Sequence, residues 1–416
     1  MRASAPIPAR GPAGVAVAAT VGNMIGVTAA ILATFGVFLV PIATEFGWPR
    51  ASVSGVLGLI AVVSALLIPF VGRAMDLFGS RRILIGGNVL LATSIALLSR
   101  SSGSMLQFYL LFALIGVAGS LVGTAMFCKV VSNWFDARRG LMLGVTAGGG
   151  NGIGATVMPI VAGLLVAAYG WRVAYLGIAA IVLLVGFPTL FLLLRDAPPR
   201  IEAPRAELDG LTLREAAHTR AFWLMLFAIA AGAGGMTAVF THVVPMLTDH
   251  GFGLAAATGV IATFALVTAA WQIVTGALLD RLRTPRLIVP MYGAAIAGLL
   301  LLEFGHGTAS AMVAGTLLGI GMGAEYAALA YFISRYFGLK HFGSIVGALY
   351  SVVILAQGIT PGLMDMSFDR TGSYAVATIA IALALGVGML LLSFLPPLEV
   401  QKPQASEETV GMALAA

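Results

Sequence analysis

The sequence predicts an all-α membrane protein whose twelve transmembrane helices form two pseudo-symmetric bundles of six. Composition is the first reason: 59% of the 416 residues are apolar and 10% are charged, with a mean hydropathy of +1.00. An average soluble domain is about 25% charged, so this chain has too little polar surface to cover a water-soluble globule. The length of the apolar runs and an internal repeat are the other two reasons.

Apolar runs that can cross about 30 Å of hydrocarbon, at about 1.5 Å per helical residue, recur along the chain. These runs lack the alternation of barrel strands, so we expect helices that satisfy their own backbone hydrogen bonds in lipid. They lie at residues 15–43, 52–75, 82–100, 105–134, 140–168, 172–194, 221–249, 254–280, 286–305, 308–336, 342–366 and 373–396.

An internal repeat makes the chain two copies of one half. The segment Gly72–Arg82 returns as Gly276–Arg286, 204 positions later, and the same offset pairs Val40–Trp48 with Val244–Phe252. We expect a six-helix bundle at 1–194, a cytoplasmic linker at 195–220, a second bundle at 221–397 and a cytoplasmic tail at 398–416. Six spans per copy make the repeat parallel, and in transporters of this build the site lies near the bilayer midplane between the halves.

Basic residues predict the orientation. If both termini lie inside, inner loops and tails hold 18 of the 23 Lys and Arg residues, and the outer loops hold four; both termini are therefore expected in the cytoplasm. The remaining one, Lys129, lies within the fourth span. We expect a multi-pass protein of a bacterial inner (cell) membrane, and the pI near 9.7 reflects this charge bias rather than nucleic-acid binding.

The duplicated Gly-x-x-x-Asp-x-x-Gly-x-Arg-Arg loop on twelve spans resembles the major facilitator superfamily over nearly the whole chain. Within it, further motifs resemble the monocarboxylate transporter and oxalate/formate antiporter branch. These motifs are Gly36-Val37-Phe38 with Pro41, Glu45–Trp48, Trp134–Gly140, Tyr169–Arg172 and Arg335–Gly338. The resemblance implies transport of a small organic anion by alternating access, with a proton or by exchange.

The same resemblance implies a cytoplasmic gate. By position it assigns gate roles to Asp76, Arg81 and Arg82, and weaker ones to Asp280 and Arg281. Arg335, at the end of the tenth span, is expected at the gate or against lipid headgroups.

The chain differs from this branch at the positions that bind the substrate carboxylates. Oxalate-type antiporters carry an arginine in the eighth span and a lysine in the eleventh; here Thr268–Gln272 and residues 342–366 hold neither. The first-span lysine of animal monocarboxylate transporters is also absent. A dicarboxylate is therefore disfavoured, and a monocarboxylate needs another partner.

Ionisable residues inside spans are costly, so they are the first site candidates. Glu325 lies near the middle of the tenth span, where burial disfavours the charged form and a proton could be taken up and released; the alternative is a structural hydrogen bond to Tyr326 or Tyr331. Lys129 is either a substrate cation or a snorkelling lysine. His242 is either a proton switch or a structural histidine near the outer interface.

Uncharged polar residues complete the predicted site, with helix packing as the alternative for each. They are Asn23, Asn151, Trp271, Gln272, Tyr331 and Gln357. The string Gly148–Ala155 follows no strand, so it predicts close helix packing rather than a nucleotide-binding turn. We expect no cofactor and no metal, since neither a phosphate-binding loop nor a metal-ligand cluster occurs and Cys128 is the single cysteine.

Three classes of function remain. The first is a secondary transporter of a small, monocarboxylate-like organic anion, and the second is an exporter of hydrophobic or drug-like compounds. The third, a polytopic enzyme or a non-transporting receptor, is weakest because no nucleophile–base pair or metal site is evident. The expected partners are a small-molecule substrate, protons and the lipid bilayer, with no nucleic acid and no obligate protein partner.

Overall fold

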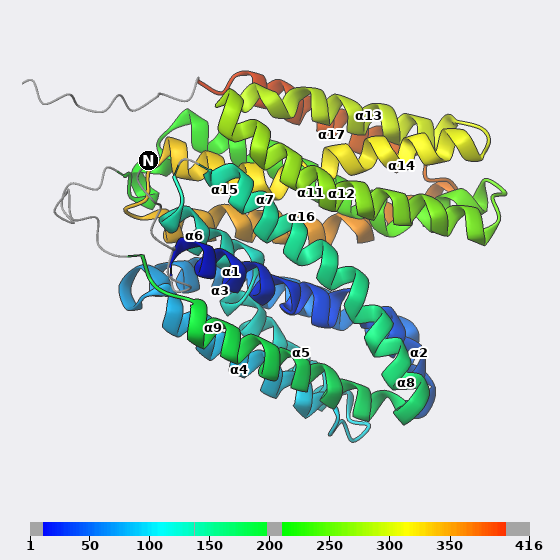
Figure 1. Cartoon of the computed structure of the whole chain (residues 1–416). Helices are drawn as coiled ribbons and strands as arrows, with labels where there is room; N and C mark the ends of the chain where they lie inside the picture. The colour runs from blue at the N-terminus through cyan, green and yellow to red at the C-terminus, as the bar shows by residue number, and fades with distance from the viewer. Residues whose placement is uncertain (1–10, 137, 198–209, 397–416) are drawn as a thin grey trace, which may run out of the picture.

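The computed structural model describes residues 11–136, 138–197 and 210–396, and every regular element in these ranges is a helix. The predicted tail at 398–416 and the linker residues 198–209 lie outside the described residues. In Figure 1 the first half runs from blue to green in the lower part of the picture, and the second half runs from green to red above it. We call the end that carries the linker the linker end.

The first half contains helical segments that are continuous or interrupted by short π-helical turns. They are α1 (Pro12–Met24), η1 (Thr28–Leu32), α2 (Phe35–Phe46), α3 (Arg50–Phe78), α4 (Ser80–Leu98), α5 (Met105–Leu121), α6 (Thr124–Trp134), α7 (Arg139–Gly144), η2 (Val145–Gly150), α8 (Asn151–Ile181), η3 (Val182–Gly186) and α9 (Phe187–Leu193).

The second half is built in the same way. Its elements are α11 (Arg220–Asp249), α12 (Leu254–Leu282), η4 (Pro285–Leu287), α13 (Ile288–Phe304), α14 (Thr308–Met322), α15 (Glu325–Tyr336), α16 (Phe342–Thr371) and α17 (Ala375–Ser393).

These segments account for the twelve predicted spans. Ten helical stretches among the described residues are long and apolar enough to cross a membrane, and one of them, Arg139–Leu193, has 55 residues and forms the fifth and sixth spans. The tenth span is divided into α14 and α15, and the fourth into α5 and α6. These two breaks, which the sequence analysis did not predict, place two short helices at equivalent positions of the two halves.

Gly170 turns the chain between the fifth and sixth spans. Its φ is 79°, in the left-handed region where a side chain strains the backbone and glycine does not. We expect Gly170→Ala to lower the melting temperature of the detergent-solubilised protein, because this strain costs about 1–3 kcal/mol while no atom lies within 4 Å of the new Cβ.

Gly163→Ala is the matched control for that measurement. Gly163 lies in the same helix, also with no atom within 4 Å of an added Cβ and without a positive φ. We expect its melting temperature to stay the same or rise, since alanine restricts the unfolded chain. Equal melting temperatures for the two variants would contradict the strain argument.

The linker contacts both halves at its two ends. Asp196 Oδ1 accepts hydrogen bonds from the backbone N–H groups of Ser80 (2.6 Å) and Arg81 (3.0 Å) at the start of α4. The helix α10 (Leu213–Ala217) begins at a capping box in which the backbone and hydroxyl of Thr212 donate to Glu215, and these bonds hold the pKa of Glu215 below its ordinary value. The backbone N–H of Leu211 donates to the carbonyl of Phe337 at 2.9 Å, so this end of the linker is docked against the second half.

Candidate substrate site and linker-end gate

Two pairs of glycines join the halves at the linker end. A Cβ on Gly72 would collide with the backbone carbonyl of Gly343, and a Cβ on Gly276 would collide with that of Gly140. The two pairs are related by the internal repeat, since Gly276 follows Gly72 by 204 positions and Gly343 follows Gly140 by 203. The helices α3 with α16, and α12 with α7, therefore touch backbone to backbone, and the linker end is closed. In Figure 1 the two halves lie together at this end and separate toward the other.

A carboxylate of the repeated loop lies at each glycine contact. Asp280 crosses between the halves, where its two oxygens accept hydrogen bonds from the backbone N–H groups of Gly140 (2.8 Å) and Leu141 (2.9 Å). Asp76 lies at the equivalent contact, where its Oδ2 would be 2.8 Å from a Cβ on Gly343. Both predicted gate acids thus lie where the halves meet.

Two arginines also bridge the halves at the linker end. Arg139, which is 2% exposed, donates to Ser334 Oγ of α15 at 3.0 Å. Arg335 of α15 reaches Asp136 of the first half at 3.3 Å. The predicted role of Arg335, at the gate or against lipid headgroups, stays a prediction, and Arg139 and Asp136 were not among the predicted site residues.

The other predicted gate arginines make no described contact across the halves. Arg81 donates to the carbonyl of Phe191 (2.7 Å) within the first half. Arg82 and Arg281 are exposed, and no ion pair to either is found among the described residues. Their predicted gate roles stay predictions.

Lys129 is buried in the first half, paired with an acid. Its Nζ lies 2.6 Å from Asp76 Oδ1 and donates to the carbonyl of Gly72 at 3.0 Å. The ammonium group also packs against Gly343 of the second half, and the two predicted roles of Lys129, substrate cation or snorkelling lysine, stay predictions. The ion pair holds Asp76 at the seam with Gly343.

We expect Lys129→Met to destabilise the protein more than the double variant Lys129→Met/Asp76→Asn. Breaking a buried ion pair leaves one charge unpaired, which costs about 3–5 kcal/mol, and we expect the lower end because Asp76 is 20% exposed. Melting temperatures of the purified variants test this. If the double variant melts no higher than the single one, the pair does not hold Asp76 at the seam.

Glu325 begins α15 at the break in the tenth span. Eleven residues separate it from Tyr336 at the linker end of that helix, or about 17 Å at 1.5 Å per residue, which is close to the middle of the hydrocarbon. The residue is 3% exposed, and neither carboxylate oxygen has a hydrogen-bond partner among the described residues. A buried carboxyl without a partner is costly as an anion, so it favours a bound proton.

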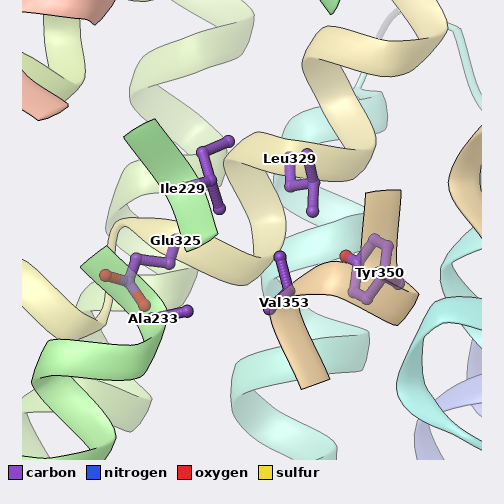
Figure 2. A pocket seen from close by; sticks show the side chains of 6 residues that line it. All are labelled: Ile229, Ala233, Glu325, Leu329, Tyr350 and Val353. Carbon is purple, nitrogen blue, oxygen red and sulfur yellow. The ribbon is translucent and has the colours of Figure 1, made fainter. Parts of the chain in front are cut away.

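Apolar side chains surround this carboxyl. Figure 2 shows Glu325 on the wall of a narrow pocket between α11, α15 and α16, with its carboxylate directed toward Ala233 of α11. The pocket has no room for a water molecule in this conformation. Its lining consists of Ile229, Ala233, Glu325, Leu329, Tyr350 and Val353.

Neither Tyr292 nor Tyr331 donates a hydrogen bond to Glu325. Oε1 of Glu325 would lie 2.7 Å from a Cβ on Gly232, and the hydroxyl of Tyr292 packs against the same glycine. That hydroxyl donates to the carbonyl of Ala228 at 3.4 Å. Tyr331, the suggested structural partner, donates instead to the carbonyl of Leu279 at 3.1 Å. The side chain of Tyr326 lies outside the described residues.

A polar relay occupies the equivalent break in the first half. Asn23 Nδ2 donates to the carbonyl of Thr146 (2.8 Å), Thr124 Oγ1 donates to Asn23 Oδ1 (2.9 Å), and Asn151 Nδ2 donates to Thr124 Oγ1 (3.0 Å). Thr124 begins α6 as Glu325 begins α15. The first half thus presents neutral amides where the second half presents an acid.

Trp271 and Gln272 of α12 lie between these two polar groups. Across the seam, Gln272 packs so closely against Gly148 that a Cβ added to this glycine would lie 2.5 Å from the Cβ of Gln272. The Cβ of Trp271 packs in the same way against Gly323, at the break before Glu325. The side-chain oxygen of Gln272 and the indole nitrogen of Trp271 are both buried without a described partner. Gln357 is partly buried on α16.

His242 lies apart, at the end opposite the linker. Its Nδ1 is 2.7 Å from the carbonyl of Ala238 and its Nε2 is 2.7 Å from Asp365 Oδ1. The hydroxyl of Thr241 also lies 3.0 Å from Nδ1. The predicted proton-switch role of His242 stays a prediction, and its site is separate from Glu325.

Several residues of these groups were missed from the sequence. Thr124, Thr146 and Tyr292 are residue types that recur throughout the spans, and only their partners single them out. Glu303 is a second buried acid, at the end of the ninth span, where Thr378 donates to it at 3.3 Å. It was not predicted as a site residue because it lies near the end of a span rather than near the middle.

Comparisons with known proteins agree with this architecture. The model of the Major Facilitator Superfamily matches residues 18–361. Monocarboxylate transporter 11 of Homo sapiens is 27% identical over 89% of this chain and 80% of its own. Multidrug resistance protein MdtG of Dickeya zeae is 28% identical over 65% of this chain and 66% of its own. The solved structure of the fucose:proton symporter FucP of E. coli superposes with a TM-score of 0.71, at 16% identity, over 91% of this chain and 98% of FucP.

The family model, which matches most of the chain, together with the fold identifies a multi-pass membrane transporter rather than an enzyme. The chain belongs to the Major Facilitator Superfamily. The resemblance to monocarboxylate transporters that its motifs predict is confirmed by the human relative, and the all-α, twelve-helix fold is confirmed by the structural one.

Proposed function

We propose that this protein is a secondary transporter that moves a small organic acid together with a proton, with Glu325 as the proton carrier. The observation that carries the proposal is the burial of an unpartnered carboxyl at the break of the tenth span, near the middle of the membrane. An ionisable residue at this depth is rarely structural without a partner. It is neutral while dry, and it releases its proton when the surrounding pocket is wetted.

The two halves alternate access by rocking about this region. The linker end is the cytoplasmic end in this proposal, because most of the basic residues lie on that side. The closed glycine pairs and the contacts of Asp280, Arg139 and Arg335 then form the cytoplasmic gate. Their separation opens the path to the cytoplasm.

A monocarboxylate-like substrate is supported by the relationship to the human monocarboxylate transporter. A dicarboxylate is disfavoured, since the eighth and eleventh spans lack the two cations that oxalate-type antiporters use. An acid that crosses with one proton moves no net charge across the membrane. While that proton is shared between the substrate and Glu325, the two carboxyl groups carry one negative charge instead of two, so coupling through Glu325 reduces the need for a fixed internal cation.

Uptake of labelled lactate, pyruvate, formate and oxalate into proteoliposomes tests the proposal. An inward proton gradient should stimulate uptake of at least one of the three monocarboxylates, and collapse of the gradient with an ionophore should remove the stimulation. Empty liposomes control for passive entry of the neutral acids. Failure to transport any of the three monocarboxylates would overturn the assignment to small organic acids.

Export of hydrophobic or drug-like compounds is the second candidate. The observation that favours it is the pairing of Lys129 with Asp76, which leaves that cation unavailable to an organic anion. Similarity to MdtG is compatible with it. Increased drug tolerance of cells that overexpress this protein, without acid uptake in proteoliposomes, would select this function.

A further inference from the structure

The hydrogen-bond relay of the first half fixes which atom Asn151 presents. The carbonyl of Thr146 can only accept, so the atom of Asn23 that lies 2.8 Å from it is the amide nitrogen. Asn23 Oδ1 then faces Thr124 Oγ1 at 2.9 Å and takes the single proton of that hydroxyl. One backbone carbonyl thus determines the orientation of the first two members.

The amide orientation of Asn151, the third member of the relay, follows from the same count of protons. With its proton donated, Thr124 Oγ1 can only accept, so the atom of Asn151 at 3.0 Å is Nδ2. The other amide atom, Oδ1, is turned away from the relay and is buried without a partner among the described residues. Turning any one amide around would bring two acceptors or two donors together.

A second amide oxygen comes from the other half. Gln272 Oε1 of α12 has no described partner and lies 3.3 Å from the position of a Cβ on Gly148. Gly148 and Asn151 are three residues apart in the fifth span and are therefore neighbours on its surface. Gly152 also touches Ala269 of α12. Both halves thus bring an acceptor to the same stretch of the seam.

We propose that this stretch recognises a hydroxyl group of the substrate, which donates to Asn151 Oδ1 with Gln272 Oε1 as the neighbouring acceptor. The transported acid is then a hydroxy-substituted monocarboxylate rather than an unsubstituted one. That the ligand is an acid rests on the proposed function, whereas the need for a donor rests on the relay. The relay residues are uncharged, so they match a neutral hydroxyl better than an ammonium group.

The energetic basis is the cost of leaving a buried acceptor unpaired. A site whose polar atoms are oriented for a hydroxyl rejects an analogue without it, because those atoms are then desolvated with nothing in return. Because Oδ1 is buried in the closed linker-end state, the hydroxyl reaches it as the halves move about the seam. The relay holds the acceptor in place during that movement.

Binding of three matched acids to the purified protein in detergent tests this inference. Lactate, propionate and alanine carry a hydroxyl, a hydrogen or an ammonium group at the α-carbon, so the first two are anions of equal charge and alanine is a zwitterion. Half-saturating concentrations come from ligand-dependent thermal stabilisation. For the parent we expect lactate to bind about three- to tenfold more tightly than propionate, as for one net hydrogen bond, and alanine to bind no better than propionate. Asn151→Leu should remove the difference between lactate and propionate.

Asn88→Leu is the matched control. Asn88 is also a buried amide whose Nδ2 donates to a carbonyl, that of Val182 at 3.2 Å, and whose Oδ1 has no described partner. It packs against Gly186 within the first half, so its loss should leave the preference for lactate unchanged. Should Asn151→Leu fold poorly, Thr124→Val frees the amide of Asn151 and should weaken the same preference.

Every outcome of these binding measurements either supports or overturns the inference. Equal binding of lactate and propionate by the parent, a preference that survives in Asn151→Leu, tighter binding of alanine, or no binding of any of the three overturns the inference. Because binding is measured without transport, a preserved hydroxyl preference with no proton-driven uptake would count against the proposed function alone. Proton-driven uptake without a hydroxyl preference would count against the inference alone.

Discussion

Glu325→Gln is expected to abolish proton-driven accumulation of substrate while exchange across the membrane continues. Glutamine keeps the size of the side chain but cannot bind and release a proton. With one proton per substrate, a gradient of one pH unit, worth about 1.4 kcal/mol, supports about tenfold accumulation, and the variant should reach only equal concentrations inside and outside. Uptake into proteoliposomes under such a gradient, and counterflow into liposomes preloaded with substrate, measure the two properties separately.

Glu303→Gln is the matched control, since Glu303 is a second buried acid of the same half. Its carboxylate accepts from Thr378 and lies 4.0 Å from His250 at the far end of the ninth span. We expect this variant to accumulate substrate like the parent. Full accumulation by Glu325→Gln would remove Glu325 from the coupling mechanism, and loss of accumulation in both variants would show that the effect is not specific to the tenth span.

Much of the fold follows from local properties of the sequence. Runs of apolar residues have a length that the bilayer dictates, and the duplicated loop at Gly72 and Gly276 gives the relation between the halves. The breaks before Thr124 and Glu325 were not predicted, because a helix interruption inside an apolar run leaves little trace in composition. The turn at Gly170 was predicted only as a span boundary.

The candidate site could be predicted where a residue is unusual for its surroundings. Glu325, Asn23 and Asn151 stand out in apolar spans whatever their partners are. The role of Lys129 was not predictable in this way, because its partner Asp76 lies in another helix, 53 positions earlier, and the pairing depends on how those helices pack. Pairwise geometry, rather than residue type, decides between a substrate cation and a gate residue.

Gly276→Val is expected to hold the linker end open and to slow transport at least tenfold. A side chain there meets the backbone carbonyl of Gly140, and backbone atoms cannot turn aside as a flexible side chain can. Overpacking of this kind costs about 1–3 kcal/mol, which lowers the ratio of closed to open molecules by roughly five- to 150-fold. Labelling of Ser334→Cys with a maleimide reports the change, because Ser334 is buried against Arg139 at the closed seam.

Because the glycine contact occurs twice, the internal repeat adds a second variant to this prediction. Gly72 meets Gly343 as Gly276 meets Gly140, so Gly72→Val should also raise the labelling rate of the cysteine, although the two substitutions lie in different halves. Gly86→Val on α4, where no atom lies within 4 Å of an added Cβ, should label and transport like the parent. If only one of the two seam variants opens the linker end, the two contacts are not equivalent parts of one gate. If neither does, closure does not depend on the glycine contacts.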